Sequence, residues 1–283
     1  MKAIKEDRMK TVKSILIKIT ILILCLIEAY PIFWMLTASF KQQHEWVSKP
    51  AYALNSSFHF QNYIDAWTRG HMSTYFFNSL VATLGALFFI VYFSVTVGFA
   101  LTKMRWKMRK KVALFFDMGI MVPIATALIP LFQIYNRANL LNSRVGLILV
   151  YIAFGLSLSF FLVSSYMRSL PREILEAAVI DGCDIYRLMW HIVMPLMKNA
   201  VMTILVLQFF FKWNDLLFSM TFISSSNLKT VQTGLLYFET EFGAKNWGAI
   251  FASVSMSVMP LLFIYILLNR RVIEGLTSGA VKG

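Results

Sequence analysis

Six apolar stretches, each long enough to cross a lipid bilayer, constrain the fold of this 283-residue chain more than any other feature. The apolar core of a bilayer is roughly 30 Å thick, and about 20 helical residues span it. The stretches are residues 14–40, 75–101, 112–135, 145–166, 200–222 and 247–268. Lipid cannot hydrogen-bond an open backbone, and the strict alternation of a barrel strand is absent from the sequence. We therefore predict an all-α membrane protein with six transmembrane helices.

The distribution of basic residues predicts the orientation of these helices. The net charge of +13 would also suit a nucleic-acid-binding protein, but the charge is not spread over one face. Nineteen of the 27 Lys and Arg residues lie before the first stretch, after the second, after the fourth and after the sixth. The alternate loops contain seven. Because cytoplasmic loops are enriched in Lys and Arg, both termini are predicted to be cytoplasmic, and no nucleic-acid partner is expected.

Sequence motifs for enzymatic chemistry are missing from the chain. It contains no G-x-x-x-x-G-K-[ST] phosphate loop, no G-x-S-x-G motif and no H-E-x-x-H motif. Its four histidines show no metal-ligand spacing. We therefore expect no catalytic residue, no metal site and no cofactor or nucleotide bound by this chain. Without an internal repeat or a second composition type, residues 1–283 are predicted to form a single transmembrane domain.

A polar segment between the fourth and fifth stretches has the pattern of two short amphipathic helices. Pro171 suits a helix start, and Gly182 can adopt the left-handed conformation that ends a helix. Asp184 can cap the second helix. The apolar positions of that helix follow helical spacing and form one stripe: Ile185, Leu188, Met189, Ile192, Val193 and Leu196. The segment is predicted to lie at the cytoplasmic membrane surface.

Two interpretations of this polar segment are open from the residues alone. It could rest on lipid headgroups as an interfacial helix, or it could be a surface on which another protein docks. Ala177 and Ala178 would let another backbone approach closely. Glu176 and Asp181 would be poorly placed against anionic lipid. These residues favour the docking surface.

The same residues resemble a known family signature. Glu176-Ala177-Ala178, Asp181-Gly182, Ile192 and Met194-Pro195 resemble the EAA signature of ABC importer permeases, with Met194 where Leu is usual. Further similarity covers nearly the whole chain, at residues 31–41, 78–86, 121–132, 213–218 and 274–283. The last two segments are similar to the carbohydrate-uptake branch, specifically its smaller, six-span, maltose-type subunit.

The resemblance implies a type I ABC importer permease bundle in the bacterial cytoplasmic (inner) membrane, crossing the lipid bilayer several times. Its implied partners are a second permease subunit in a heterodimer, two copies of a cytoplasmic ATPase that bind ATP and Mg, and an extracytoplasmic sugar-binding protein. The implied function is import of an oligosaccharide or sugar derivative, with ATP hydrolysis driving alternating access. Two alternatives remain: a permease of the same fold for another solute, and a proton-coupled secondary transporter. The latter would need an inverted repeat and ionisable midplane residues, for which Glu28 is the one candidate.

In the family, a cytoplasmic loop inserts into a groove on the ATPase, and here it corresponds to residues 168–198, approximately. The residues implied to couple the two subunits are Arg172, Glu176, Ala177, Ala178, Asp181, Gly182, Ile192 and Pro195. The cytoplasmic tail, residues 269–283, either reaches the ATPase dimer interface or forms a disordered terminus.

Four residues in the fifth stretch form a candidate substrate pathway: Lys212, Trp213, Asn214 and Asp215. Charges at this depth are costly and usually face a partner or a water-filled path. Lys212 and Asp215 are three apart, so they could share a helix face and neutralise each other. In the functional interpretation Trp213 offers a ring face to a pyranose. In the structural one the charges form a pair, or Lys212 extends toward the interface.

Two further features add expectations about the loops and the helices. The first external loop, residues 41–74, is rich in aromatic residues and either contacts a binding protein or rests on the membrane interface. Pro123 and Pro130 in the third stretch predict kinks that shape a cavity.

Overall fold

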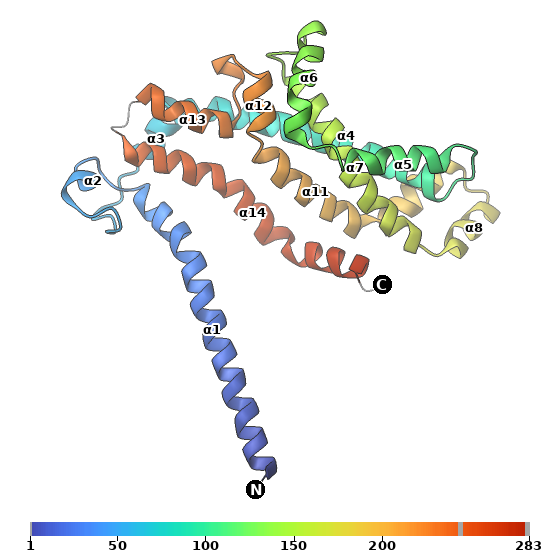
Figure 1. The fold of residues 1–283 in the computed structure, drawn as a ribbon, viewed down its shortest axis with the longest axis horizontal. Helices are drawn as coiled ribbons and strands as arrows, with labels where there is room; N and C mark the ends of the chain where they lie inside the picture. Colours follow the sequence, from blue (N-terminus) through green and yellow to red (C-terminus); the bar gives the residue numbers. More distant parts are fainter. Residues whose placement is uncertain (1, 243–245, 281–283) are drawn as a thin grey trace. The chain divides into compact units, whose positions relative to one another are not determined.

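The computed structural model describes residues 2–242 and 246–280, with side chains over residues 11–236 and 246–268. Within these ranges the chain is helical, without strands (Figure 1). The helices are α1 (Lys2–Ala38), α2 (Glu45–Ser48), α3 (Gln61–Thr68), α4 (Met72–Thr102), α5 (Arg109–Gly119), α6 (Ile124–Arg137), α7 (Arg144–Ser169), α8 (Arg172–Ile180), α9 (Ile185–Arg187), the π-helix η1 (Leu188–Val193), α10 (Met194–Leu196), α11 (Lys198–Trp213), α12 (Leu217–Phe222), the 3-10 helix η2 (Ser226–Leu228), α13 (Val231–Phe242) and α14 (Trp247–Ala280).

Four of the described helices are long and apolar enough to cross a membrane: Thr11–Ala38, Met72–Thr102, Arg144–Ser169 and Trp247–Leu268. Two bent pairs raise the number to six if each pair counts as one span. The pairs are Arg109–Gly119 with Ile124–Arg137, bent by 103°, and Ile185–Leu196 with Lys198–Trp213, bent by 74°. The prediction of an all-α membrane chain is therefore confirmed.

Two of the predicted spans are interrupted. The third, residues 112–135, breaks between α5 and α6, and Pro123 is the residue that precedes α6. Proline lacks an N–H and fixes its own φ, so it suits the first position of a new helix and not the interior of an old one. The predicted kink at Pro123 is confirmed. The fifth, residues 200–222, stops at Trp213 and resumes at Leu217 in α12.

The described chain divides into two compact units. The first contains residues 1–70 and 238–256, and the second contains residues 71–237 and 257–283. Helices α13 and α14 each have residues in both units.

The second unit is built on the close packing of α4 against α7. A Cβ atom added to Gly85 would lie 3.0 Å from Ile148 Cδ1, and one added to Gly98 would lie 2.6 Å from Val163 Cγ1. Without side chains, these glycines let the neighbouring helix come close. The residue numbers of the contacting pairs rise together along both helices, so α4 and α7 run in the same direction.

Helix α11 runs in the opposite direction along α7. Gln208 Nε2 donates to Ser159 Oγ at 3.0 Å, and Tyr151 Oη donates to Asp215 Oδ2 at 2.8 Å. As the α7 residue number rises, its partner's number falls, which defines an antiparallel pair.

The first turns of α4 and α7 are tied to the segment between α12 and α13. Asn78 Nδ2 donates to the carbonyls of Asn227 and Lys229, both at 2.9 Å. Arg144 Nε donates to Asn78 Oδ1 at 2.9 Å. Asn142, which has a positive φ of 50°, accepts at Oδ1 from the backbone N–H groups that follow α12. These side chains fix three connections at the same end of the parallel helices.

In the first unit, aromatic side chains connect the C-terminal part of α1 to the start of α14. Phe251 packs edge-on against Trp34 at 5.2 Å and stacks on Trp46 at 5.1 Å, measured between ring centroids. Asn62 Nδ2 donates to the carbonyls of Ser39 and Lys41. The apolar residues of α1 before this cluster are exposed, as expected of a helix that faces lipid or another membrane subunit.

Helix α14 continues through most of the predicted tail. It ends at Ala280, so residues 269–280 are helical, whereas Lys282 and Gly283 lie outside the described residues.

Candidate functional site

The polar segment after α7 forms two helical parts that meet at Gly182. Its N–H donates to the Val179 carbonyl at 3.1 Å, and its φ of +79° is in the left-handed region. Asp184 Oδ1 then accepts from the N–H groups of Tyr186 and Arg187 at 2.9 and 2.8 Å. These hydrogen bonds, chiefly that from Arg187, keep the pKa of Asp184 below its usual value. The predicted glycine turn and the predicted cap are both confirmed.

The second helical part departs from the predicted geometry. Residues 188–193 form a π-helix, which contains one more residue per turn than an α-helix and shifts the side chains that follow. Leu188, Met189 and Val193 are buried, but Ile185 and Leu196 are 44% and 46% exposed. The predicted apolar stripe is therefore buried in the middle and exposed at both ends.

The eight predicted coupling residues do not share one face. Ala178 is buried in the core cluster that also contains Leu175. Ile192 is half-buried. The other six are exposed: Arg172, Glu176, Ala177, Asp181, Gly182 and Pro195. The two adjacent alanines therefore have different environments, since Ala178 packs inward and Ala177 faces out.

Sequence reasoning missed three exposed apolar side chains beside this turn. Ile180 is 85% exposed, Tyr186 is 74% exposed and Val179 is 59% exposed. They come from the residues just before and just after Gly182, and large exposed apolar groups are typical of an interaction surface. Part of this signal was available in the sequence, since a helix that buries Leu175 and Ala178 turns residue 180 away from both, although residue 179 lies one turn from Leu175.

A groove separates α8 from the end of α4. It has a volume of about 420 Å³, and its lining includes Glu176 and Ile180 together with Phe99 and Lys103. Lys103 Nζ donates to the Leu170 carbonyl at 2.9 Å, which joins the end of α4 to the junction of α7 and α8. The exposed coupling residues thus sit on a segment that is fixed to both α4 and α7.

The four predicted pathway residues also separate into two sets. Trp213 is 1% exposed, its Nε1 donates to the Ser257 carbonyl at 2.9 Å, and its ring stacks on Phe209 at 5.5 Å. This ring packs inside the subunit and presents no face to a sugar. Asn214 is exposed, and its amide bonds the Phe210 carbonyl and Gln232.

Lys212 and Asp215 line a common cavity with Tyr151 but do not form the expected pair. The helix ends at Trp213, so Asp215 leaves the face on which Lys212 lies. The ion pairs among the described side chains are Lys49–Glu45 and Arg69–Asp65. Neutralisation of Lys212 by Asp215 through a direct ion pair is therefore not observed.

Glu28 lies on the exposed surface of α1 within the first span. A carboxyl group in that position would face lipid or another chain, and charged groups in lipid are costly. It is not placed inside a bundle of this subunit's own helices, as a proton relay would require.

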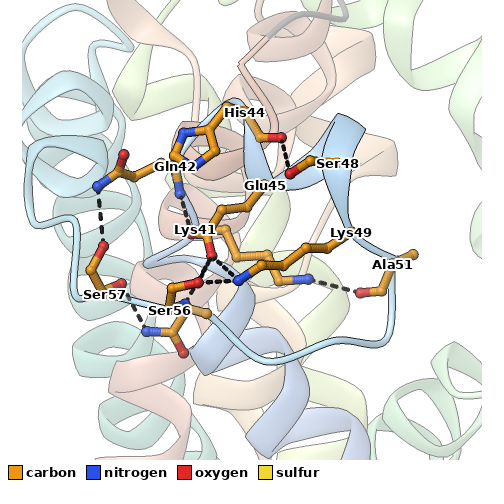
Figure 2. A network of polar contacts seen from close by, with 10 residues as sticks. Lys41, Gln42, His44, Glu45, Ser48, Lys49, Ala51, Ser56 and Ser57 are labelled. Carbon is orange, nitrogen blue, oxygen red and sulfur yellow. Dashed lines mark hydrogen bonds and ion pairs between the residues drawn. The ribbon is translucent and has the colours of Figure 1, made fainter.

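The loop that the sequence predicts to be external is ordered around one buried carboxylate (Figure 2). Glu45, 1% exposed, accepts at Oε1 from the N–H and Oγ of Ser56 and from Lys49 Nζ, and at Oε2 from the Gln42 N–H. Lys49 Nζ also donates to Ser56 Oγ. Burial alone would raise the pKa of Glu45, but the hydrogen bonds from Ser56, Gln42 and Lys49 outweigh it and lower the pKa to about 2.

We predict that this loop loses order in acid. A carboxyl whose folded pKa lies below its usual 4.5 stabilises the fold above pH 4.5, and the contribution disappears as the pH falls toward 2. Glu45→Gln should open the loop already at neutral pH, at a cost of about 2 kcal/mol, since it leaves donors without their charged acceptor. Hydrogen–deuterium exchange of residues 41–57, corrected for intrinsic rates, measures this. The exposed Gln43→Ala is the control, and equal exchange at pH 3 and pH 6 would contradict the prediction.

The apolar helices and the exposed two-part segment between α7 and α11 define a class of protein, the integral membrane protein of several apolar helices that also carries an exposed helical segment. Comparison with known proteins gives the family. The family model described as "Binding-protein-dependent transport system inner membrane component" matches residues 90–277. A sulfoquinovosyl glycerol transport system permease protein of Agrobacterium fabrum is 32% identical over 257 residues, 90% of this chain and 89% of that protein.

Two further comparisons agree. A melibiose/raffinose/stachyose import permease protein of Bacillus subtilis is 30% identical over 254 residues, 89% of this chain and 91% of that protein. A chain in the crystal structure of a bacterial ABC transporter involved in the import of the acidic polysaccharide alginate has the same fold, with a TM-score of 0.81. That match has 20% sequence identity and covers 92% of this chain and 96% of the other.

The chain belongs to the family of binding-protein-dependent transport system inner membrane components, the permeases of ABC importers. It is a multi-pass inner-membrane protein and a transport subunit rather than an enzyme. Membership of this family implies partnership with another permease, an ATPase and a binding protein.

Proposed function

We propose that this subunit imports an oligosaccharide or a sugar derivative, with ATP hydrolysis by separate ATPase subunits driving alternating access. The sugars named for its relatives, a sulfoquinovosyl glycerol and the melibiose, raffinose and stachyose group, support a saccharide as the solute. The single observation that carries the coupling mechanism is the exposed turn at Gly182, which presents charged and apolar side chains on a segment fixed to α4 and α7.

Six spans with both termini in the cytoplasm fit this mechanism. Helices α4 and α7 are parallel and α11 is antiparallel to them, which is the alternation that six spans require. The bent pair of α5 and α6 then counts as the third span, and α11 forms the main part of the fifth. This orientation puts the α8–α10 segment on the cytoplasmic side, where an ATPase is found, and the Glu45 loop outside, where a binding protein approaches.

The complex we propose has four membrane-associated parts and one delivery protein. This chain pairs with a second permease subunit as a heterodimer, and two copies of the ATPase bind from the cytoplasm. The exposed apolar side chains of α1 support a membrane partner beyond lipid alone, because Glu28 on the same helix would be costly in lipid. The binding protein delivers the sugar at the outer face.

In the proposed coupling mechanism the segment of residues 168–198, approximately, moves with the ATPase. Glu176 makes a charged contact there, Ile180 and Val179 fill an apolar depression, and Gly182 sets the angle between the two helical parts. Coupling needs a docking energy that differs between the two ATPase states. The helical tail that ends at Ala280 is proposed to reach toward the ATPase interface.

Reconstitution of the tagged complex tests the proposed function. The expected result is co-purification of an ATPase subunit and ATPase activity that rises several-fold when binding protein and its sugar are added to proteoliposomes. The control is the same complex with binding protein but without sugar. Recovery of the subunit without an ATPase, together with uptake driven by a proton gradient, would instead support the secondary-transporter alternative. Stimulation by a solute other than a saccharide would support a permease of the same fold for that solute.

A further inference from the structure

A cavity of about 270 Å³ lies where the two interrupted spans meet α7. Both breaks border it: Ile120 and Val122 come from the α5–α6 break, and Asp215 comes from the α11–α12 break. Non-helical backbone at membrane depth is tolerated only where it is buried in protein or lines a water-filled space. Two breaks at one cavity therefore indicate a polar site.

Lys212 is the charged group in this cavity wall whose hydrogen-bonding capacity is unused. Its side chain is 8% exposed, and its Nζ lies 5.5 Å from the centre of the Tyr151 ring. An ammonium group has three N–H donors. In the described part of the chain, no carboxylate oxygen is within ion-pair distance of this Nζ.

The neighbouring carboxylate is already committed to the fold. Asp215 Oδ2 accepts from Tyr151 Oη at 2.8 Å and from the Ser219 N–H at 2.9 Å, and Oδ1 accepts from the Phe218 N–H at 3.2 Å. It caps the first turn of α12 through these hydrogen bonds, and Lys212 interacts with it by electrostatic attraction without a direct ion pair. A second polar wall residue is Gln208. Its Nε2 donates to the Gly155 carbonyl and to Ser159 Oγ on α7, and its buried Oε1 has no hydrogen-bond partner in the described residues.

The rest of the wall is mostly apolar, contains four aromatic rings and limits the size of a ligand. Phe154, Phe211 and Phe218 line the cavity with Tyr151. Ordinary ligand pockets measure roughly 300–1,000 Å³, so this cavity is slightly smaller than that range and fits one sugar ring and not an oligosaccharide. Aromatic side chains offer apolar faces that pack against the C–H face of such a ring.

We propose that this cavity is a subsite for one acidic sugar ring, whose carboxylate accepts hydrogen bonds from Lys212 while the aromatic wall packs against the ring. The inference rests on the proposed function, in which the solute is a saccharide. A buried ammonium without an acceptor is costly, and an anionic oxygen relieves that cost better than a hydroxyl does. Trp213 and Asn214 are not part of the subsite, because the first packs in the core and the second bonds elsewhere.

Direct binding tests the proposal without the binding protein. The permease–ATPase complex in phosphatidylcholine nanodiscs is probed by saturation-transfer NMR with methyl α-D-galactopyranosiduronic acid and, separately, with methyl α-D-galactopyranoside. The expected result is a signal about fivefold stronger for the acid than for the neutral glycoside. Lys212→Met should remove the difference, whereas Lys212→Arg, which keeps the charge, should retain it. Lys111→Met, at an exposed position on α5, is the matched control and should change nothing.

Three results would overturn the subsite: equal signals for the two glycosides, an acid signal that survives Lys212→Met, or no signal from either. Size-exclusion profiles of the variants show whether the complex still assembles. Retained binding in Lys212→Arg shows that a substitution at this position does not by itself destroy the cavity. Failure of the proposed function is distinct from all three. In that case no saccharide raises the ATPase activity of the complete complex, whatever the glycosides do in the NMR experiment.

Discussion

Gly182→Pro is expected to abolish sugar-stimulated ATPase activity in the reconstituted importer, to less than about a tenth of the wild-type rate. Proline fixes φ near −65°, whereas this position has a φ of +79°. Proline also removes the N–H that donates to the Val179 carbonyl. The turn must therefore open, at a cost of roughly 3 kcal/mol, and the exposed side chains around it lose their arrangement. ATPase assays in proteoliposomes, with immunoblotting for the inserted subunit, measure the effect.

Gly182→Asn is the matched control, because asparagine tolerates the left-handed region better than other residues with a side chain. The space beside Gly182 is open, since no atom lies within 4 Å of an added Cβ, so only the backbone angle is at issue. Near-normal coupling is expected for this variant. Glu176→Lys should reduce coupling by about tenfold through charge reversal alone. Normal transport by both Gly182→Pro and Glu176→Lys would show that the segment does not couple.

Gly146→Ala should cause a large loss of stability for a single added methyl group. The new Cβ would lie 2.1 Å from the carbonyl oxygen of Leu140, a backbone atom that cannot rotate away. Leu140 is itself fixed by its N–H bond to the Tyr135 carbonyl. Overpacking of this kind costs roughly 3 kcal/mol. The melting temperature in detergent should fall by on the order of 5–10 °C.

Gly85→Ala tests whether the backbone contact is the cause. Its Cβ would lie 3.0 Å from Ile148 Cδ1, the flexible end of a side chain that can turn aside. A small change in melting temperature is expected there, and equal losses in both variants would contradict the explanation. Both glycines contact unit-two helices, so the two variants are compared within the same packed region.

The sequence predicts the helical class and the glycine turn well because these depend on local chemistry. Apolar length indicates the spans, and a left-handed glycine followed by a capping aspartate sets the turn at Gly182 wherever the segment is placed. The exposure of Glu176 and the burial of Leu175 follow from the same helical spacing. The apolar content of the sequence also locates the third and fifth stretches, but it does not predict where these stretches are interrupted.

Other features depend on contacts distant in sequence. Asp215 leaves the helix because its carboxylate accepts hydrogen bonds from Tyr151, 64 residues away, and from two N–H groups of α12. Trp213 is buried because its Nε1 donates to the Ser257 carbonyl and its ring stacks on Phe209. Residues 188–193 adopt a π-helix, and no periodicity in the sequence indicates the extra residue in that turn. Sequence spacing assumed an unbroken α-helix in each case.

The hydrogen bond from Lys103 to the Leu170 carbonyl has a mechanical consequence. It joins the C-terminal end of α4 to the C-terminal end of α7. From there α7 extends without a break back to Tyr151, about 19 residues or roughly 28 Å away. The pair of α4 and α7 is therefore rigid, whereas the two interrupted spans that line the other sides of the cavity can bend at their breaks. A displacement of α8 would therefore move the α7 wall of the cavity as a rigid body. The interrupted spans would bend at their breaks, so the cavity would change shape as well as position.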